Sequence, residues 1–232
     1  MKNISVHKNR IFVGIYLISA NIIFPQIVLK NPGIPMFESI SYRQEINGNV
    51  ESLDVEVENI EENNYKWIEY RLLSNEQDIL IKFNSDNLTA FYSEIWDKKS
   101  DSTVHTINEI VKNNKVVKGK ELLITDMYGF LLSIRGFPWG EKKSAQIVFL
   151  NGSSDFKLDL KVKGKETVQI DDKFYECWKV QMGIGGIMGA IFPKSNYWYG
   201  VESPHILIRS ESTRTPGSPK TILEINSYKS NL

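Results

Sequence analysis

The residues that could do chemistry are few and stand far apart in the chain. Cys177 is the single cysteine, and only His105 and His205 of the three histidines lie beyond the first 30 residues. Neither histidine has a second ligand at the spacing that zinc sites use, and no Gly-x-Ser-x-Gly elbow supplies a serine nucleophile. Cys177 is typical of a small packed residue, and Asp171-Asp172 is typical of a turn. The sequence therefore predicts a protein that is not an enzyme, with no metal site and no cofactor.

Three basic residues form the best candidate for holding an anionic head group. His205 follows Pro204 and opens the next-to-last strand that we expect, and Arg209 lies four residues further on. In an element of period two these residues share a face, and Arg135 at the end of the expected helix can join them. The alternative interpretation is a solvated face of the sheet.

The stretch 183–199, GIGGIMGAIFPKSNYWY, combines four glycines with large apolar residues. Met188 stands where a dinucleotide fingerprint needs glycine, and no Gly-Lys-Ser/Thr sequence makes a phosphate loop. The stretch is too short to span a bilayer. Its apolar residues must cover something, so it is either a plug at one end of a barrel, or a lid or lip for an apolar ligand or a membrane surface.

The elements that position these residues are mostly strands. From Met36 onward apolar and polar residues alternate with a period of two, and Asn47-Gly48 suits a tight hairpin. VKGKE occurs at 117–121 and at 162–166, and we interpret both copies as Lys-Gly turns. The pattern predicts a mainly β fold, a large curved antiparallel sheet or half-open barrel of about a dozen strands.

One segment, about residues 126–136, breaks the alternation. Asp126 is a good N-cap, the residues after it are apolar almost all round a helical wheel, and Pro138 stops the helix. A helix of this kind must be enclosed, so we expect it against the concave face of the sheet. The apolar residues that we expect to line the interior are Phe130, Leu131, Ile134, Trp178, Met182, Ile187, Met188, Phe192 and Trp198. The alternation does not distinguish a filled interior from a hollow one.

Composition limits the classes of partner. The 28 basic and 28 acidic residues cancel, which excludes the positive field of nonspecific nucleic-acid binding. Residues 1–24 join a basic start to an apolar run, which predicts a signal peptide or an N-terminal anchor. We expect export to the periplasm or cell envelope, close to a membrane, with residues 36–230 forming a single β-rich domain.

Several motifs together resemble a known family. They are the Asp126 helix ending in Arg135, FYECWKV, the Gly-rich stretch, SPHILIRSES and PGSP, and together they cover roughly residues 36–228. In these motifs the sequence resembles the domain-of-unknown-function family 3108, a group of exported bacterial proteins. The resemblance implies a curved antiparallel sheet around an apolar helix, similar to the periplasmic lipoprotein-carrier fold, and it implies no catalytic residues.

Two functions of different classes follow from these observations. The first is a non-enzymatic envelope protein that binds or carries an apolar, lipid-like ligand inside the half-barrel. The second is a structural or assembly factor that docks an envelope protein through the apolar loop 183–193. An elongated internal cavity would favour the first function, and a solid interior with an apolar surface patch the second.

Overall fold

The computed structural model describes residues 27–108, 121–124, 128–151, 154–186, 189, 191–213 and 215–231. Strands dominate these residues, and the helical part is confined to one short segment. The elements are β1 (Phe37–Ile46), β2 (Asn49–Glu62), β3 (Tyr65–Leu73), β4 (Gln77–Asn84), β5 (Ala90–Asp97), β6 (Ser102–Asn108), β7 (Glu121–Ile124), α1 (Phe130–Ser133), η2 (Ile134–Gly136), β8 (Ser144–Asn151), β9 (Ser154–Ile170), β10 (Lys173–Gly183), β11 (Ser195–Gly200), β12 (Leu207–Thr213) and β13 (Lys220–Asn231).

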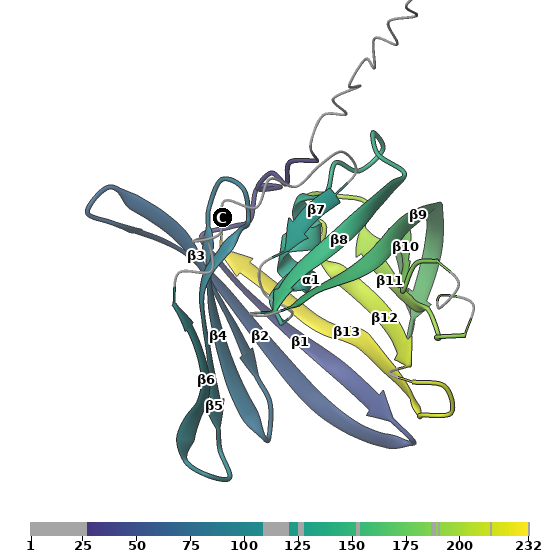
Figure 1. Cartoon of the computed structure of the whole chain (residues 1–232), viewed down its shortest axis with the longest axis horizontal. Coiled ribbons are helices and arrows are strands. Elements are labelled where there is room, and N and C mark those ends of the chain that lie inside the picture. The colour runs from purple at the N-terminus through teal and green to yellow at the C-terminus, as the bar shows by residue number, and fades with distance from the viewer. Residues whose placement is uncertain are drawn as a thin grey trace, which may run out of the picture.

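All strands of the described residues belong to one 13-stranded sheet, in the order β6-β5-β4-β3-β2-β1-β13-β12-β11-β10-β9-β8-β7. Neighbouring strands are antiparallel except β7 and β8, which run parallel. In Figure 1 the sheet bends around α1, with β2–β6 on one side and β8–β12 on the other. The predicted fold, a curved half-barrel that encloses one helix, is confirmed.

One of the predicted turns is present in the structure and another is not. Asn47 and Gly48 have φ values of 53° and 81° and form the predicted β1–β2 hairpin. The predicted Lys-Gly turn at 162–166 is wrong, because these residues lie inside β9. Gly164, with φ 130°, pairs with Lys179, and the pairing slips by one residue just before it. Glycine here accommodates a β-bulge that bends the long strand.

The helix is shorter than the predicted range 126–136. It begins at Phe130, has no side-chain cap, and continues after Ser133 as a 3₁₀ turn. Asp126, the predicted N-cap, lies outside the described residues. A Cβ at Gly129 would lie 2.4 Å from Phe83 Cζ, so the start of the helix touches β4 through bare backbone. The helix therefore begins where the chain meets the sheet.

The helix is enclosed as predicted. Leu132 and Ile134 are at most 1% exposed. The ring of Phe130 meets that of Tyr197 edge-on at 5.6 Å, and Tyr199 Oη donates to the Leu131 carbonyl. Contacts to β4 on one side and to β11 on the other place the helix between the two halves of the sheet. No helix among the described residues is long and apolar enough to cross a membrane.

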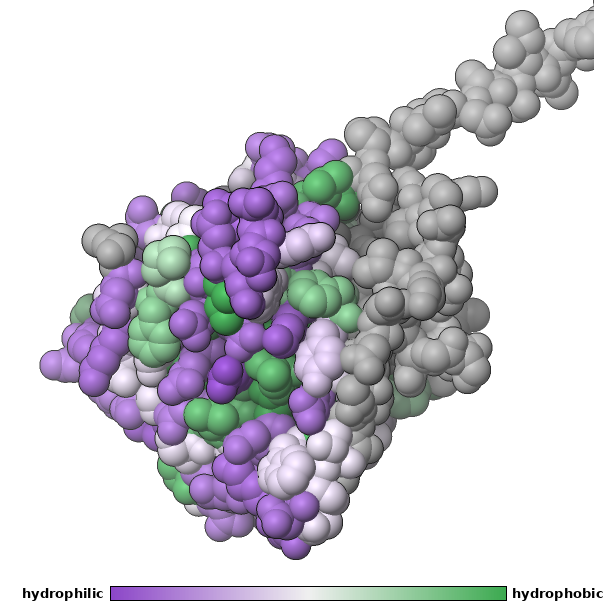
Figure 2. Space-filling view, turned by 90° about the vertical axis from the view of Figure 1, so that its left-hand side faces the viewer, coloured by the Kyte–Doolittle hydropathy of each residue, from purple (hydrophilic) through white to green (hydrophobic). Residues whose placement is uncertain are grey.

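Figure 2 shows the side of the molecule on which β3–β6 lie. Hydrophilic residues cover much of this face, and apolar ones gather near its middle. Exposed aromatic residues on these strands include Tyr65, Phe91 and Trp96. The core, in contrast, is a continuous cluster on the concave face that includes Val57, Ile81 and the helix. One wet face and one buried face explain the alternation in the sequence.

Candidate functional site

Side chains fill most of the space between the helix and strands β1–β3, β12 and β13. The cavity between the helix and the sheet has a volume of about 20 Å³. Tyr42, Tyr70, Leu131 and Arg135 are among the residues that line it. A space of this size holds about one water molecule. This cavity therefore has no room for a hydrocarbon chain while the side chains around it stay in place.

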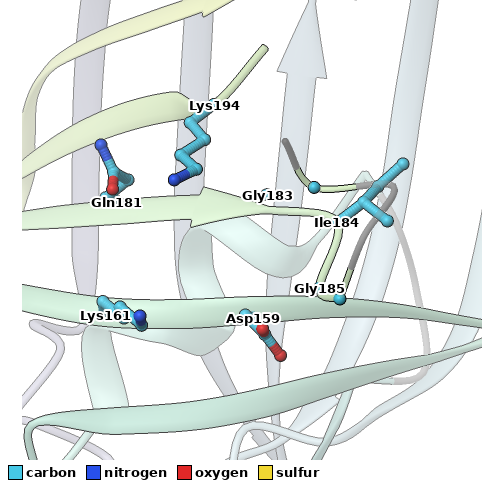
Figure 3. Close-up of a pocket in the computed structure, with 9 residues that line it drawn as sticks. Asp159, Lys161, Gln181, Gly183, Ile184, Gly185 and Lys194 are labelled. Carbon is cyan, nitrogen blue, oxygen red and sulfur yellow. The ribbon is translucent and has the colours of Figure 1, made fainter. Parts of the chain in front are cut away.

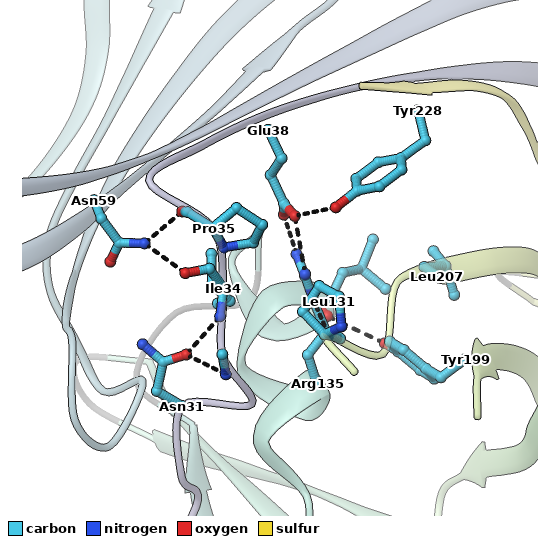
Figure 4. A network of polar contacts seen from close by, with 12 residues as sticks. Asn31, Ile34, Pro35, Glu38, Asn59, Leu131, Arg135, Tyr199, Leu207 and Tyr228 are labelled. Atoms are coloured by element: carbon cyan, nitrogen blue, oxygen red, sulfur yellow. Dashed lines mark hydrogen bonds and ion pairs between the residues drawn. The ribbon is translucent and has the colours of Figure 1, made fainter. Parts of the chain in front are cut away.

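A buried ion pair joins the helix to the sheet (Figure 4). Arg135, at the end of the helical segment, donates through Nη1 and Nη2 to the carboxylate of Glu38 on β1. Arg135 Nε donates to the Pro204 carbonyl at 2.8 Å, and Tyr228 Oη donates to Glu38 Oε2 at 3.3 Å. Arg135 is 3% exposed and Glu38 is fully buried. Each charge is therefore compensated by the other and by neutral hydrogen-bond partners.

Neutral phenols surround this ion pair. Tyr42 Oη donates to the Leu207 carbonyl at 3.1 Å. Burial raises the pKa of Tyr42 and of Tyr70 above the usual value for a phenol. Both side chains therefore stay uncharged at physiological pH, and the helix end sits in a neutral, hydrogen-bonded setting.

A larger cleft opens on the other side of Arg135, and we call it the N-terminal cleft. Its volume is about 350 Å³. The residues that line it are Ile27, Val28, Lys30, Asn31, Pro32, Arg135, Gly136, Phe137, Pro138, Glu141, Lys142 and His205. The cleft thus combines apolar surface with two lysines, a glutamate and a histidine. Pockets for small molecules typically have volumes of about 300–1,000 Å³.

Hydrogen bonds fix the N-terminal segment that forms one wall of this cleft. The Lys30 amide donates to the Gly136 carbonyl at 3.1 Å. Asn31 Oδ1 accepts from the amides of Gly33 and Ile34, and Asn59 Nδ2 donates to the Ile34 carbonyl (Figure 4). The wall is therefore tied to both the helix end and β2, and the cleft is preformed.

His205 completes the cleft from the loop before β12. Its Nδ1 lies 2.9 Å from the Gly200 carbonyl, which only accepts, so Nδ1 carries the proton. Its ring packs at 5.9 Å from that of Trp139. Burial lowers the pKa of His205, and the charge of Arg135 lowers it further. The neutral ring keeps Nε2 as an acceptor.

Arg209 does not join Arg135 and His205, which corrects the predicted grouping. Arg209 Nη2 donates to Glu211 Oε1 at 2.6 Å, and Nη1 forms an ion pair with Glu224 Oε1 at 2.9 Å. His205 has φ 56° and precedes β12, which starts at Leu207, and the β11–β12 pairing slips by one residue just before Arg209. The slip places the Arg209 guanidinium over Trp198, on the face of the sheet opposite the helix.

The predicted apolar lining separates into groups. Phe130, Leu131, Ile134 and Met182 belong to the core or pack directly against it. Trp178 stacks at 6.1 Å on Trp139. Phe192 is half-buried in the loop before β11, and Ile187 and Met188 lie outside the described residues.

Trp198 is only 6% exposed, but its indole lies on the face of the sheet opposite the helix and does not line the interior. Its Nε1 donates to Glu166 Oε1, and Lys179 stands over its ring. Tyr199, the next residue, reaches the helix, and successive residues of a strand point to opposite faces. The prediction of Trp198 as a lining residue is therefore wrong.

Four residues of this region were missed by sequence reasoning: Lys30, Glu38, Trp139 and Lys142. The sequence does contain a signal for Glu38, because alternation places its side chain on the same inward face as Ile40 and Tyr42. A charged side chain on that face needs a partner. The lysines had none, because lysine in a loop is ordinarily solvated.

The groups with catalytic potential do not converge. Cys177 is buried, and burial raises the pKa of its thiol to about 12, so the nucleophilic thiolate is absent at physiological pH. Within the described ranges, no group of three or more His, Cys, Asp or Glu side chains could hold a metal ion.

Comparison with known proteins gives a family and several distant structures. The model of the family described as "Protein of unknown function (DUF3108)" matches residues 74–224. No curated protein matches the chain. A β-barrel-like DUF1849 protein from Brucella abortus is 10% identical, with 88% of this chain and 98% of that chain covered and a TM-score of 0.48.

Two lipoprotein structures are similar at lower scores. The hypothetical lipoprotein YmcC from Escherichia coli is 13% identical, with 84% of this chain and 88% of that chain covered and a TM-score of 0.35. The lipoprotein LppX from Mycobacterium tuberculosis is 14% identical, with coverages of 84% and 87% and a TM-score of 0.29.

Proposed function

The chain belongs to the DUF3108 family of proteins of unknown function, and we propose that it is a non-enzymatic cell-envelope protein that binds an amphipathic, lipid-like ligand in the N-terminal cleft. The observation that carries the proposal is the cleft itself. It has a volume of about 350 Å³, and apolar side chains line it together with Lys30 and Lys142. The cavity beside the helix is too small for such a ligand, so we place the ligand at this opening instead.

The cations define the head group. Neither the Lys30 nor the Lys142 ammonium makes an ion pair or hydrogen bond with a described residue, whereas Arg135 is already neutralised by Glu38. Glu141 contributes one opposing charge. The balance favours an anionic group such as a phosphate or a carboxylate, and hydrogen bonds to charged groups contribute about 1.5–3 kcal/mol each.

Apolar side chains define the rest of the ligand. Ile27 and Phe137 form part of the cleft wall, and Val28 is 57% exposed beside them. Covering such surface stabilises a complex by about 0.8 kcal/mol for each buried methylene. Because residues 27–32 form one wall, an uncleaved anchor at residues 1–24 would hold this cleft close to a membrane surface. That position suits a ligand that comes from a bilayer.

A titration with a soluble short-chain phosphatidic acid tests this proposal. Trp139 contacts His205 at the cleft, so its fluorescence reports binding. We expect the double variant Lys30→Ala/Lys142→Ala to bind at least about tenfold more weakly than the wild type, a loss of about 1.4 kcal/mol.

The matched control is Lys163→Ala/Lys173→Ala, which removes two exposed lysines from β9 and β10, and we expect it to bind within about twofold of the wild type. Equal affinities for the two double variants, or saturable binding that neither affects, would contradict the proposed site.

A second function, docking of an envelope protein, has its own observation. Ile191 of the loop 183–193 is 64% exposed, which is unusual for a large apolar side chain. A photo-crosslinking residue at position 191 should then join one partner in stoichiometric yield. The same residue at the equally exposed Phe174 is the control, and equal crosslinking at both positions would contradict specific docking.

A further inference from the structure

A second cleft lies at the Gly-rich stretch, and we call it the glycine cleft (Figure 3). Its volume is about 320 Å³, and Asp159, Lys161, Gln181, Gly183 and Lys194 are among its lining residues. It is built on the β9–β10 pair together with the residue that precedes β11. It shares no lining residue with the N-terminal cleft.

The strand register explains how these side chains come to face one another. Asp159 lies directly opposite Gly183, and Lys161 lies opposite Gln181. Met182 pairs with Ser195, which puts Lys194 across from Gly183 on its other side. Neighbouring strands lie about 4.8 Å apart, so the backbones of Asp159 and Lys194 are about 10 Å apart with Gly183 between them.

The glycines keep this gap open. A Cβ at Gly183 would lie 3.0 Å from Lys194 Cγ, so the lysine stem rests directly on the strand. A Cβ at Gly185 would lie 2.6 Å from Asp159 Oδ2, so the carboxylate rests against bare backbone. Side chains at these two positions would push Lys194 and Asp159 out of the cleft.

The charges in the cleft have opposite signs and are not paired with each other. Asp159 makes no ion pair with a described residue and accepts one hydrogen bond, from Gln146 at 3.4 Å. The ammonium groups of Lys161 and Lys194 have no polar partner among the described residues. The cleft thus has two cations and one anion around a floor made of glycine.

We infer that the glycine cleft binds a zwitterionic group, with an ammonium against Asp159 and a phosphate or carboxylate against Lys161 and Lys194. A lone anion would be repelled by Asp159, and a lone cation by the two lysines. A ligand that carries both charges a few bonds apart satisfies both walls. This chemistry occurs in free amino acids and in phosphoethanolamine head groups. The site is separate from the proposed N-terminal cleft.

Calorimetric titration of the full chain with four probes tests the inference: phosphoethanolamine, glycine, inorganic phosphate and ethanolamine. We expect at least one zwitterion to bind about tenfold more tightly than either singly charged probe. Tighter binding of phosphoethanolamine identifies a head group as the source, and tighter binding of glycine identifies an amino acid. Equal binding of all four probes would overturn the inference.

Variants separate the charges from the fold. Asp159→Asn should remove the preference for the zwitterion over inorganic phosphate, and Lys161→Ala/Lys194→Ala should weaken zwitterion binding about tenfold. Gly185→Ala should act like Asp159→Asn, because it displaces the carboxylate while keeping both lysines. Lys173→Ala is the matched control and should bind as the wild type does. A zwitterion preference that survives Asp159→Asn would overturn the inference.

Discussion

Arg135 and Arg209 each pair with glutamate, but they lie on opposite faces of the same sheet. Arg135 is 3% exposed and its partner Glu38 is fully buried at the helix end. Arg209 is 26% exposed and bridges Glu211 and Glu224, each with 16–18% exposure, on the outer face. The residue types are the same, and their surroundings differ.

Burial sets the energetic role of each ion pair. A buried charge that loses its partner keeps the full cost of desolvation, whereas water compensates a partly exposed one. Arg135 therefore holds the helix to the sheet, and Arg209 contributes little to stability.

Glu38→Gln should have the largest effect. It leaves the Arg135 charge buried without its counter-ion, so we expect the free energy of unfolding to fall by about 3–5 kcal/mol. Urea denaturation followed by tryptophan fluorescence measures this change. The double variant Glu38→Leu/Arg135→Met removes both charges and should be more stable than Glu38→Gln alone. A loss below about 1 kcal/mol for Glu38→Gln would show that the pair is solvated.

Ile134→Ala tests the helix beside this ion pair. Ile134 is fully buried, so its truncation should lower the free energy of unfolding by about 2–5 kcal/mol. Val50, which is 59% exposed at the β1–β2 hairpin, is the control. Val50→Ala should change stability by about 0.5 kcal/mol or less. Equal effects at the two positions would contradict an enclosed helix.

His205 should make the stability of the protein depend on pH. Because its pKa is lowered in the folded state, the unfolded chain binds a proton more readily, and the contribution of His205 to stability is complete above the unfolded pKa of about 6.5. That contribution is lost as the pH falls through the folded pKa. The difference in stability between the wild type and His205→Gln should therefore shift against the wild type on acidification. A constant difference from pH 7.5 to pH 5 would contradict this burial.

Arg209→Met should have the smallest effect. Its ion pairs are partly exposed, so we expect a loss of about 1 kcal/mol or less, which shrinks in 1 M salt because exposed charges are screened. Urea denaturation at low and high salt measures both quantities. A loss that equals that of Glu38→Gln would remove the distinction between the two arginines.

The sequence predicts local turns better than it predicts the register of strand pairing. The pair Asn47-Gly48 predicts its hairpin because few residue pairs tolerate two positive φ values. The side on which Arg209 lies depends on a one-residue slip in strand pairing, which has no local signal because several strands decide it together. The Gly164 bulge has no distinct local signal either, because glycine suits both a turn and a bulge.

The candidate site was predicted in part. Arg135 and His205 do meet at one cleft, as the sequence suggested. The contributions of Lys30 and Lys142 depend on how the segment before β1 packs against the helix end, through backbone hydrogen bonds that carry no sequence signature. The space left beside the helix depends on side-chain packing, so the alternation of apolar and polar residues alone could not show how small it is.

Native mass spectrometry of the protein purified from its own envelope tests the proposed function most directly. We predict one amphipathic anion bound to each wild-type chain, and loss of that mass in Lys30→Glu/Lys142→Glu but not in Lys163→Glu/Lys173→Glu. Wild-type protein that is repeatedly empty, or equal occupancy in both double variants, would contradict binding at the N-terminal cleft.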